Sequence, residues 1–580
     1  MSEGNRSRSR LLPSLLGLLI LLSGLALLAG GIKLASLGGS LYYLLAGIGL
    51  ALSGLLLLLG KRAALGLYAL VLFASTVWAL WEVGLDWWQL VPRLALWFVF
   101  GLLLWLPWFR RPLLADGPAP LGTAALGVAV VLAGAAAVGS QFTNPGQIVG
   151  RIDRDSGMTS TAPAMPDGDW QAYGRTEFGD RYSPLKQITP ANVGQLEEAW
   201  RIRTGDLPTA DDPLELTNEN TPLKVNGMLY ACTAHSKVLA LDLNTGKLRW
   251  NYQFTHHDLW DMDVGSQPTL LDLKTADGVK PALIAPTKQG SLYVLDRRDG
   301  TPIVPIREVP APQGAVEGDH TAPTQARSDL NLLRPPLTER DMWGSSPFDQ
   351  MLCRIQFRSL RYEGQYTPPS EQGSLIYPGN VGVFNWGGVS VDPVRQILFT
   401  SPNYMAFVSQ MVPRDKVPSG SKREGETSGV QPNTGAPYAV IMHPFMSPIG
   451  LPCQAPSWGD VAGIDLTTAK VVWQHKNGTS RDNTPVPIGL TVGVPSMGGS
   501  ITTAGGVAFL SGTLDQYLRA YDVKDGKQLW QARLPAGGQA TPMSYTGKDG
   551  RQYVLIVAGG HGSFGTRMGD YIIAYALPRQ

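Results

Sequence analysis

The chain has 580 residues, a formal net charge of only +2, and 67 Gly with 44 Pro. So many turn-forming residues in a chain longer than one ordinary domain predict membrane segments joined to a β-rich body. No basic cluster is interleaved with aromatic residues, which excludes a nucleic-acid partner. The three cysteines, Cys232, Cys353 and Cys453, are too far apart for a CxxC zinc or redox motif and allow at most one disulfide.

Five strongly apolar segments occupy the first 140 residues. Each is bounded by charges, prolines or turn residues and approaches the length needed to cross a hydrocarbon core. A cleaved signal peptide would supply only one such segment, so the run predicts a transmembrane anchor of five helices over residues 1–140. The segments are Leu11–Gly31, Gly39–Leu59, Ala63–Trp81, Leu94–Phe109 and Leu121–Gly139.

Basic residues gather at alternate ends of these segments, which predicts that those ends face the cytoplasm. An odd number of spans then carries the remaining chain to the far side of a bacterial inner membrane, the periplasm. Residues 141–168, rich in Gly, Ser, Thr and Pro, are interpreted as a linker, and 169–580 as the periplasmic domain. The basic residues are Arg6, Arg8 and Arg10 before the first segment, Lys61 and Arg62 after the second, and Arg110 and Arg111 after the fourth.

A repeat runs through the second part of the chain, with an Asp eight residues before a Trp and turn-like residues between them. It occurs at Ala240–Trp250, Gly463–Trp473 and Ala520–Trp530, and a fourth copy, Val294–Val304, has Val304 in place of the Trp. Short apolar strands flank every copy. The pattern predicts hairpins whose indole packs on the next unit, and it favours an all-β propeller over tandem β-sandwiches.

The repeat also aligns ionisable residues. His235 and Asp515 lie seven residues before the Asp of their copies, and Lys288 lies eight residues before its own. Equivalent positions of a propeller form a ring around its axis, so these three residues are a candidate polar ligand site. The alternative is that tight turns favour polar residues without any ligand.

The stretch His256–Asp263, HHDLWDMD, holds two imidazoles, three carboxylates and an indole. Adjacent His256 and His257 would point to opposite faces of an extended chain, so both could rarely bind one metal ion. A second alternative is a solvated loop. A third is a catalytic segment, in which one Asp is a general base and the neighbouring imidazoles and indole orient it. Composition alone leaves all three open.

Long stretches of the chain resemble one family, the membrane-bound quinoprotein dehydrogenases that use pyrroloquinoline quinone (PQQ). The resemblance is closest to its glucose dehydrogenases, with quinate/shikimate dehydrogenases as relatives, and it covers nearly the whole chain. The stretches are Asp169–Asp206 (DWQAYGRTEFGDRYSPLKQITPANVGQLEEAWRIRTGD), HHDLWDMD, Pro286–Gly300 (PTKQGSLYVLDRRDG), Leu360–Gly373 (LRYEGQYTPPSEQG), Pro378–Pro393 (PGNVGVFNWGGVSVDP), Arg533–Tyr545 (RLPAGGQATPMSY) and Ala558–Pro578 (AGGHGSFGTRMGDYIIAYALP).

The resemblance implies an eight-bladed propeller that oxidises the C1 hydroxyl of glucose to the lactone and passes electrons to ubiquinone in the membrane. Quinate or shikimate is the alternative substrate. Asp261 corresponds to the general base, and a Ca²⁺ or Mg²⁺ ion is expected beside the PQQ. The cofactor-site positions carried over are His235, Lys288, Asp515, His561, Trp386, Ser401 and Asn403.

Two departures from the family pattern bear on activity. Ser401 stands where glucose dehydrogenases have Asn, although Asn403 follows two residues later on the same strand face. Trp250 runs directly into Asn251, where the family has several further blades that hold the metal ligands and a Trp stacked on the cofactor. The chain therefore has room for fewer than eight blades, and no replacement for the metal ligands is found. A catalytically inactive propeller that acts as a scaffold or binding module is the alternative hypothesis.

Overall fold

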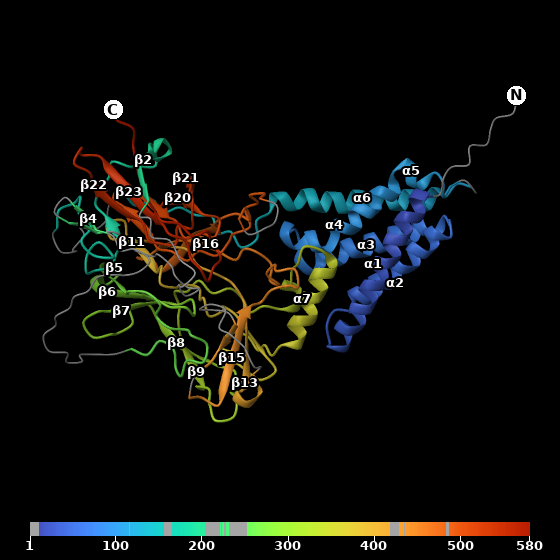
Figure 1. The fold of residues 1–580 in the computed structure, drawn as a ribbon, viewed down its shortest axis with the longest axis horizontal. Coiled ribbons are helices and arrows are strands. Elements are labelled where there is room, and N and C mark those ends of the chain that lie inside the picture. The colour runs from blue at the N-terminus through green and yellow to red at the C-terminus, as the bar shows by residue number, and fades with distance from the viewer. Residues whose placement is uncertain are drawn as a thin grey trace. The chain divides into compact units, whose positions relative to one another are not determined.

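The computed structural model describes residues 11–114, 117–155, 165–203, 221, 223–225, 228–230, 252–417, 429–433, 435–482 and 487–579. His235, Cys232 and the first repeat copy, Ala240–Trp250, lie outside the described residues. The chain forms two compact units (Figure 1). The helical unit comprises Met1–Pro145, Leu337–Arg361 and Phe445–Pro456, and the sheet unit comprises Gly146–Pro336, Tyr362–Pro444 and Ser457–Gln580.

The five predicted apolar segments all form helices. Four of these helices are long and apolar enough to cross a membrane. The helix of the second segment, α2, is also apolar but has only 17 residues. Small residues let α1 and α2 pack closely, since a Cβ added at Gly24 would lie 2.3 Å from the backbone nitrogen of Ala51. The helices are α1 (Leu11–Ser36), α2 (Tyr42–Leu58), α3 (Ala63–Val83), α4 (Trp87–Trp105), the short α5 (Pro107–Arg110) and α6 (Pro120–Gly139).

The predicted bounds of the fourth segment, Leu94–Phe109, are wrong at both ends. Helix α4 begins seven residues earlier because the side chain of Asp86 caps it, accepting a hydrogen bond from the backbone N–H of Trp88 at 3.0 Å. The helix tolerates the buried Arg93 because its Nε lies 2.8 Å from a carboxylate oxygen of Glu82. Leu106 turns to an extended conformation before Pro107, which ends α4.

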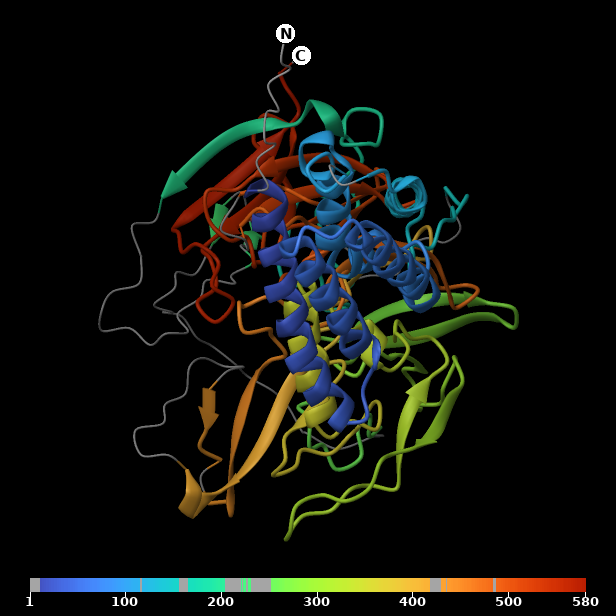
Figure 2. The same ribbon diagram turned by 90° about the vertical axis from the view of Figure 1, so that its right-hand side faces the viewer.

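Two segments that the sequence assigns to the propeller belong to the helical unit instead. One contains α7 (Pro347–Ser359), which lies against α1 and α4 (Figure 2). A disulfide joins Cys353 of α7 to Cys453, with 5.3 Å between their Cα atoms. The buried Arg354 of α7 pairs with Glu82 of α3 at 2.5 Å. These contacts link residues far apart in sequence, so hydropathy gives no sign of them.

Four sheets follow one another in the described part of the sheet unit, and their neighbouring strands are antiparallel except for the added strand β1 (Tyr182–Ser183), which pairs in parallel. Strand β2, from the beginning of the unit, completes the last sheet by pairing with β24 near the C-terminus, which is how a propeller joins its chain ends. The sheets are β5 (Thr269–Thr275), β6 (Gly278–Pro286) and β7 (Leu292–Asp296); β11 (Val389–Asp392), β12 (Ile397–Thr400), β16 (Asp460–Asp465) and β17 (Lys470–Lys476); β18 (Ser500–Thr503), β19 (Val507–Leu510), β20 (Tyr517–Asp522) and β21 (Gln528–Arg533), with β1 (Tyr182–Ser183) added; and β22 (Met543–Thr546), β23 (Gln552–Ala558), β24 (Tyr571–Ala576) and β2 (Glu197–Arg203).

The repeat residues do what their spacing predicts in the copies that the structure describes. The repeat Asp folds the turn, as at Asp522, whose Oδ1 accepts a hydrogen bond from the backbone N–H of Lys524 at 2.9 Å. The repeat Trp then packs on the following sheet. The indole N–H of Trp473 donates to the carbonyl of Val523 at 3.2 Å, and its ring covers Gly526, where a Cβ would lie 2.4 Å from it.

Further strands come from two insertions, one between the first and second sheets and one within the second sheet, between β12 and β16. A hairpin of β8 (Ile306–Pro310) and β9 (Thr324–Ser328) follows the first sheet. A further sheet contains β10 (Ser374–Ile376), β13 (Phe407–Pro413), β15 (Tyr438–Pro444) and β14 (Gly429–Gln431). A separate pair, β3 (Leu223–Val225) and β4 (Met228–Tyr230), comes before all of these.

Part of the predicted linker, residues 141–168, is packed against the sheet unit. The backbone N–H of Ile148 donates to the carbonyl of Gln474 at 2.8 Å, and the side chain of Ile152 is buried. Arg154 pairs with the turn residue Asp465 at 2.6 Å. Residues 146–155 are therefore held by the outer edge of the second and third sheets.

Candidate functional site

The HHDLWDMD segment forms a tight loop shaped by Asp258 and Trp260. The two carboxylate oxygens of Asp258 accept hydrogen bonds from the backbone N–H groups of Trp260, at 2.9 Å, and Met262, at 2.7 Å. The buried indole N–H of Trp260 donates to the carbonyl of Thr367 at 2.8 Å, which fixes the loop to the segment around Thr367. Asp258 is thus engaged in holding the loop, and its role is structural.

Asp261 lies at the turn of this loop and faces open space. Its φ is +64°, a left-handed conformation that Asp tolerates better than most residues. Its side chain is 58% exposed and lines a cavity of about 560 Å³. The other walls come from the loop between β8 and β9 and from the sheet that contains β13 and β15, through Val316, Asp319, Ser409, Met411 and Met442. This volume is sufficient for a small polar ligand.

Lys288 joins Asp261 to the first propeller sheet. Its ammonium group lies 2.7 Å from Oδ2 of Asp261 and 3.1 Å from Oδ1 of Asp263. The lysine is largely buried, so removing either carboxylate would leave its charge poorly compensated. Asp263 was not among the predicted site residues. The two-residue spacing from Asp261, which puts both side chains on one face of an extended chain, is the signal that could have indicated it.

For both Asp261 and Lys288, burial and the charge of the partner act on the pKa in opposite directions, and both pKa values end above their usual range. Partial desolvation in the cavity raises the pKa of Asp261 above its usual range, and the hydrogen bond and charge of Lys288 offset only part of that effect. Burial alone would lower the pKa of Lys288, but the hydrogen bond and charge of Asp261, together with Asp263, raise it overall. At neutral pH the group therefore contains a fixed cation beside a carboxylate of increased basicity.

A glycine lets a third segment approach Lys288. Gly382 has φ +76°, and a Cβ added there would lie 2.5 Å from Cβ of Lys288. The next residue, Val383, donates its backbone N–H to the carbonyl of Lys288 at 2.8 Å. This contact fixes the lysine backbone from the side opposite Asp263, whose carbonyl accepts the lysine N–H at 3.0 Å.

Trp386 and the chain around His561 meet in one apolar cluster. Trp386 and Phe564 pack against the buried Val381 and other apolar side chains of that cluster. The ring of His561 contacts Phe564 edge to face, with 4.8 Å between centroids, and its backbone N–H donates to Oγ1 of Thr566 at 2.8 Å. Two of the predicted cofactor positions therefore lie next to a common aromatic surface.

Asp515 and Asn403 lie between neighbouring propeller sheets. The fully buried Asp515 pairs with Arg519 and accepts hydrogen bonds from the backbone N–H and the hydroxyl of Thr479, at 2.8 and 2.9 Å. The amide of Asn403 exchanges two hydrogen bonds of 2.8 Å with the backbone of Ser496. Ser401 is half-buried. These contacts give Asp515 and Asn403 a structural use whether or not a cofactor binds.

The predicted residues are thus brought together to different degrees. Asp261 and Lys288 are in direct contact, and Trp386 and His561 share the apolar cluster beside Val381. Within the described part of the chain, no hydrogen bond or ion pair connects Asp515 to the Asp261–Lys288 pair. His235 lies outside the described residues, so its place in the predicted ring stays a prediction.

The two histidines of the loop have separate partners, as expected for adjacent residues. His256 Nε2 lies 3.0 Å from Glu308, and His257 Nε2 lies 2.7 Å from Asp319. His257, Asp319 and His320 form the one group of three potential metal ligands found among the described residues. This group contains two imidazoles and so differs from the all-oxygen set that Ca²⁺ or Mg²⁺ would need.

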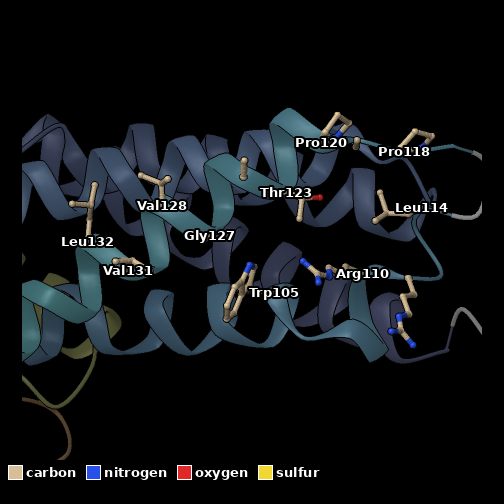
Figure 3. A pocket seen from close by; sticks show the side chains of 13 residues that line it. Trp105, Arg110, Leu114, Pro118, Pro120, Thr123, Gly127, Val128, Val131 and Leu132 are labelled. Carbon is tan, nitrogen blue, oxygen red and sulfur yellow. The ribbon is translucent and has the colours of Figure 1, made fainter.

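A larger cavity, of about 810 Å³, lies in the helical unit between α4 and α6 (Figure 3). Its walls are mostly apolar, and Trp105 lies opposite Gly127 within it. Arg110 and Arg111 are at one end. None of the lining residues that the structure describes is acidic or a histidine, so none of them can accept a substrate proton. The Asp261 cavity is the candidate active site.

Comparison with known proteins shows the family to which the chain is similar. Residues 170–247 and 237–554 match the PQQ family model, described as "Glucose/ethanol/alcohol dehydrogenase, beta-propeller domain". The chain is 36% identical to the quinoprotein glucose dehydrogenase of Escherichia coli (strain K12), with all of both chains covered. It is 36% identical to quinoprotein glucose dehydrogenase A of Acinetobacter calcoaceticus, with 94% of this chain and 96% of the relative covered. It is 30% identical to a probable quinate dehydrogenase (quinone) of Xanthomonas campestris pv. juglandis, with coverages of 97% and 100%.

The same comparisons indicate that this chain lacks a segment that its relatives have. The alignment with the Escherichia coli protein runs over 797 positions, although this chain has 580 residues, so a large part of that relative has no counterpart here. The family-model match is split, and its two parts meet at residues 237–247. That position adjoins the Trp250–Asn251 junction, where the sequence predicts the loss.

The fit of Gly382 against Lys288 gives a test by substitution. Gly382→Ala introduces a methyl group into the lysine side chain, so the free energy of unfolding should fall by about 1–3 kcal/mol more than left-handed strain alone explains. Gly550→Ala is the matched control, because Gly550 has φ +75° and nothing lies within 4 Å of its added Cβ. Urea unfolding of the two variants measures the difference, and equal losses would contradict the close packing.

Proposed function

The chain belongs to the family of membrane-bound, PQQ-dependent quinoprotein dehydrogenases, and on that premise we propose that it oxidises the C1 hydroxyl of glucose or a similar aldose to the lactone. The electrons then pass through PQQ to ubiquinone in the membrane. The observation that carries this proposal is the Asp261 carboxylate, directed into a cavity and held by the buried ammonium of Lys288.

The geometry suits Asp261 for proton transfer from a sugar hydroxyl. Oδ2 is occupied by Lys288, while Oδ1 accepts no hydrogen bond from any residue that the structure describes. A hydroxyl in the cavity can therefore donate to Oδ1. The raised pKa of Asp261 makes it a better proton acceptor than an ordinary carboxylate, as general base catalysis requires.

PQQ, when bound, supplies the two-electron acceptor for the carbon-bound hydrogen. A flat, anionic ring system needs an aromatic or apolar surface and a nearby cation. The cluster around Val381, with Trp386 and Phe564, and the ammonium of Lys288 fit those needs. We therefore assign Lys288, Trp386 and His561 to the cofactor site, with Asp515, Asn403, Ser401 and His235 as further candidates from the resemblance.

A Ca²⁺ or Mg²⁺ ion is part of the proposal, since the resemblance implies one. Such an ion takes six or more oxygen ligands, usually including several carboxylates. No group of three carboxylates lies close enough together for this among the residues described. Such an ion would supply Lewis-acid activation of the cofactor, and the described residues do not provide its ligand set.

The apolar helices would hold the enzyme in the inner membrane, where a quinone acceptor is dissolved. We propose that the sheet unit is periplasmic. Arg110 and Arg111 follow the fourth apolar helix, at an end predicted to be cytoplasmic. The disulfide between Cys353 and Cys453 supports the same orientation, because disulfides persist in the periplasm and are rare in the cytosol.

Asp261→Asn tests the proposed reaction. Full-length protein with PQQ and Ca²⁺ or Mg²⁺ should reduce an artificial electron acceptor when glucose is added, and the substitution should lower kcat by about 10²–10⁴-fold through loss of the base. Asp277→Asn, at an exposed hairpin residue paired only with Lys280, should keep full activity. A silent wild type would contradict the proposal, and activity with quinate but not glucose would move it to the quinate dehydrogenases.

Asp263→Asn tests the electrostatics of the site. The negative charge of Asp263 raises the pKa of Asp261, so its removal lowers that pKa and also leaves Lys288 to Asp261 alone. The acid limb of the kcat/KM profile reports ionisation of the base and should move to lower pH. Asp277→Asn should leave the limb in place. A shift to higher pH would exclude Asp261 as the group responsible.

The proposed orientation predicts the redox state of two thiols in the cell. Cys353 and Cys453 should resist alkylation in denatured whole-cell extracts until a reductant is added, while Cys232 reacts at once and serves as the internal control. Free thiols at all three positions would contradict a periplasmic location.

A further inference from the structure

A group of side chains that the proposed oxidation does not use lies beside the Asp261 cavity, and one of its members, Asp319, lines that cavity. His257 belongs to the loop that carries Asp261, whereas Asp319 and His320 belong to the loop between β8 and β9. Oδ1 of Asp319 lies 2.7 Å from Nε2 of His257 and 3.9 Å from Nδ1 of His320. One ligand atom from each residue lies within 4.8 Å of the other two.

The arrangement differs from a simple ion pair, and the neighbouring histidine shows the difference. His256 contacts one carboxylate, that of Glu308, and needs no third group. At Asp319 a second imidazole is present, and the rings of His257 and His320 stack with 3.7 Å between centroids. Two imidazoles therefore direct nitrogens toward one carboxylate oxygen from two different segments.

Two imidazoles and one carboxylate are the ligands of open, three-residue zinc sites. Zinc–nitrogen and zinc–oxygen distances are about 2.0–2.2 Å, which places the ligand atoms of a tetrahedral site about 3.5 Å apart. To share an ion, Nε2 of His257 and Oδ1 of Asp319, now 2.7 Å apart, need to separate, and Nδ1 of His320, now 3.9 Å from Asp319, needs to move slightly closer. The loop can supply that movement, because the side chain of His320 is 72% exposed and that of Asp319 is 36% exposed. Ca²⁺ and Mg²⁺ prefer oxygen ligands and are poorly matched to this set.

We propose that His257, Asp319 and His320 bind a Zn²⁺-class divalent transition metal ion, separate from the Ca²⁺ or Mg²⁺ of the cofactor. Because Asp319 also lines the cavity, the ion links the loop between β8 and β9 to the loop of Asp261 beside the cavity. On the proposed function, this places the ion beside the cavity that receives the sugar. Three protein ligands leave a fourth position for water or a substrate oxygen.

Metal binding by the full-length protein without PQQ tests the inference independently of catalysis. After removal of metals with a chelator, equilibrium dialysis against Zn²⁺ in excess Mg²⁺ should show one tightly bound Zn²⁺ per chain. His320→Ala removes one ligand from an exposed loop and should weaken that binding at least tenfold. His443→Ala is the control, because His443 lies on β15 with its Nδ1 beside the carbonyl of Pro444.

Any one of four results would overturn the inference. They are no Zn²⁺ bound by the wild type, equal binding by the wild type and His320→Ala, an equal loss in His443→Ala, and displacement of the Zn²⁺ by Mg²⁺. None of these results depends on activity. An inactive protein that binds Zn²⁺ through His320 would refute the proposed oxidation and leave the metal site in place. An active protein that binds no Zn²⁺ would refute the metal site and leave the proposed oxidation in place.

Discussion

The ammonium of Lys288, held between the carboxylates of Asp261 and Asp263, is the contact on which the candidate active site depends. It connects the loop of the HHDLWDMD segment to the first propeller sheet, and Gly382 brings a third segment against the same lysine. Removing a carboxylate would leave the largely buried ammonium of Lys288 with less compensation for its charge. The contact also decides which carboxylate oxygen faces the cavity, so the position of the positive charge and the availability of the base are set together.

The surrounding framework can support this contact with few blades. In the repeat copies that the structure describes, the Asp folds its own turn, and Trp473 packs on Gly526 of the next sheet. Stability is then built from nearest-neighbour contacts between sheets. The pairing of β2 with β24 joins the beginning of the sheet unit to its end. The loss of internal blades would therefore leave local packing intact while removing whatever ligands those blades carried.

Much of this organisation could be predicted from the sequence because it follows from local pattern. The apolar helices, the Asp-turn-Trp repeat and the separate directions of His256 and His257 all depend on residues near one another. The segments that depend on distant partners were missed. Nothing around Arg354 or Cys453 indicates that they belong with the helices, and the burial of Arg93 inside α4 depends on its pairing with Glu82.

In the candidate site too, the features set by nearby residues could be predicted, and those set by distant partners could not. Equivalent repeat positions predicted one polar ring, yet Lys288 contacts the cavity carboxylate while Asp515 is engaged by Arg519. Repeat register gives the position of a side chain but not its partner. Asp263 and His320 acquire their roles only through contacts with other segments, although the spacing of Asp261 and Asp263 contained part of the information.

The central claim is that this shortened chain retains a working cofactor site around Lys288. Titration of the full-length protein with PQQ, in the presence of Ca²⁺ or Mg²⁺ and followed by quenching of tryptophan fluorescence, tests it most directly. The account predicts saturation at one PQQ per chain and a marked loss of affinity in Lys288→Met. Failure of the wild type to bind PQQ, or equal binding by the variant, would contradict it.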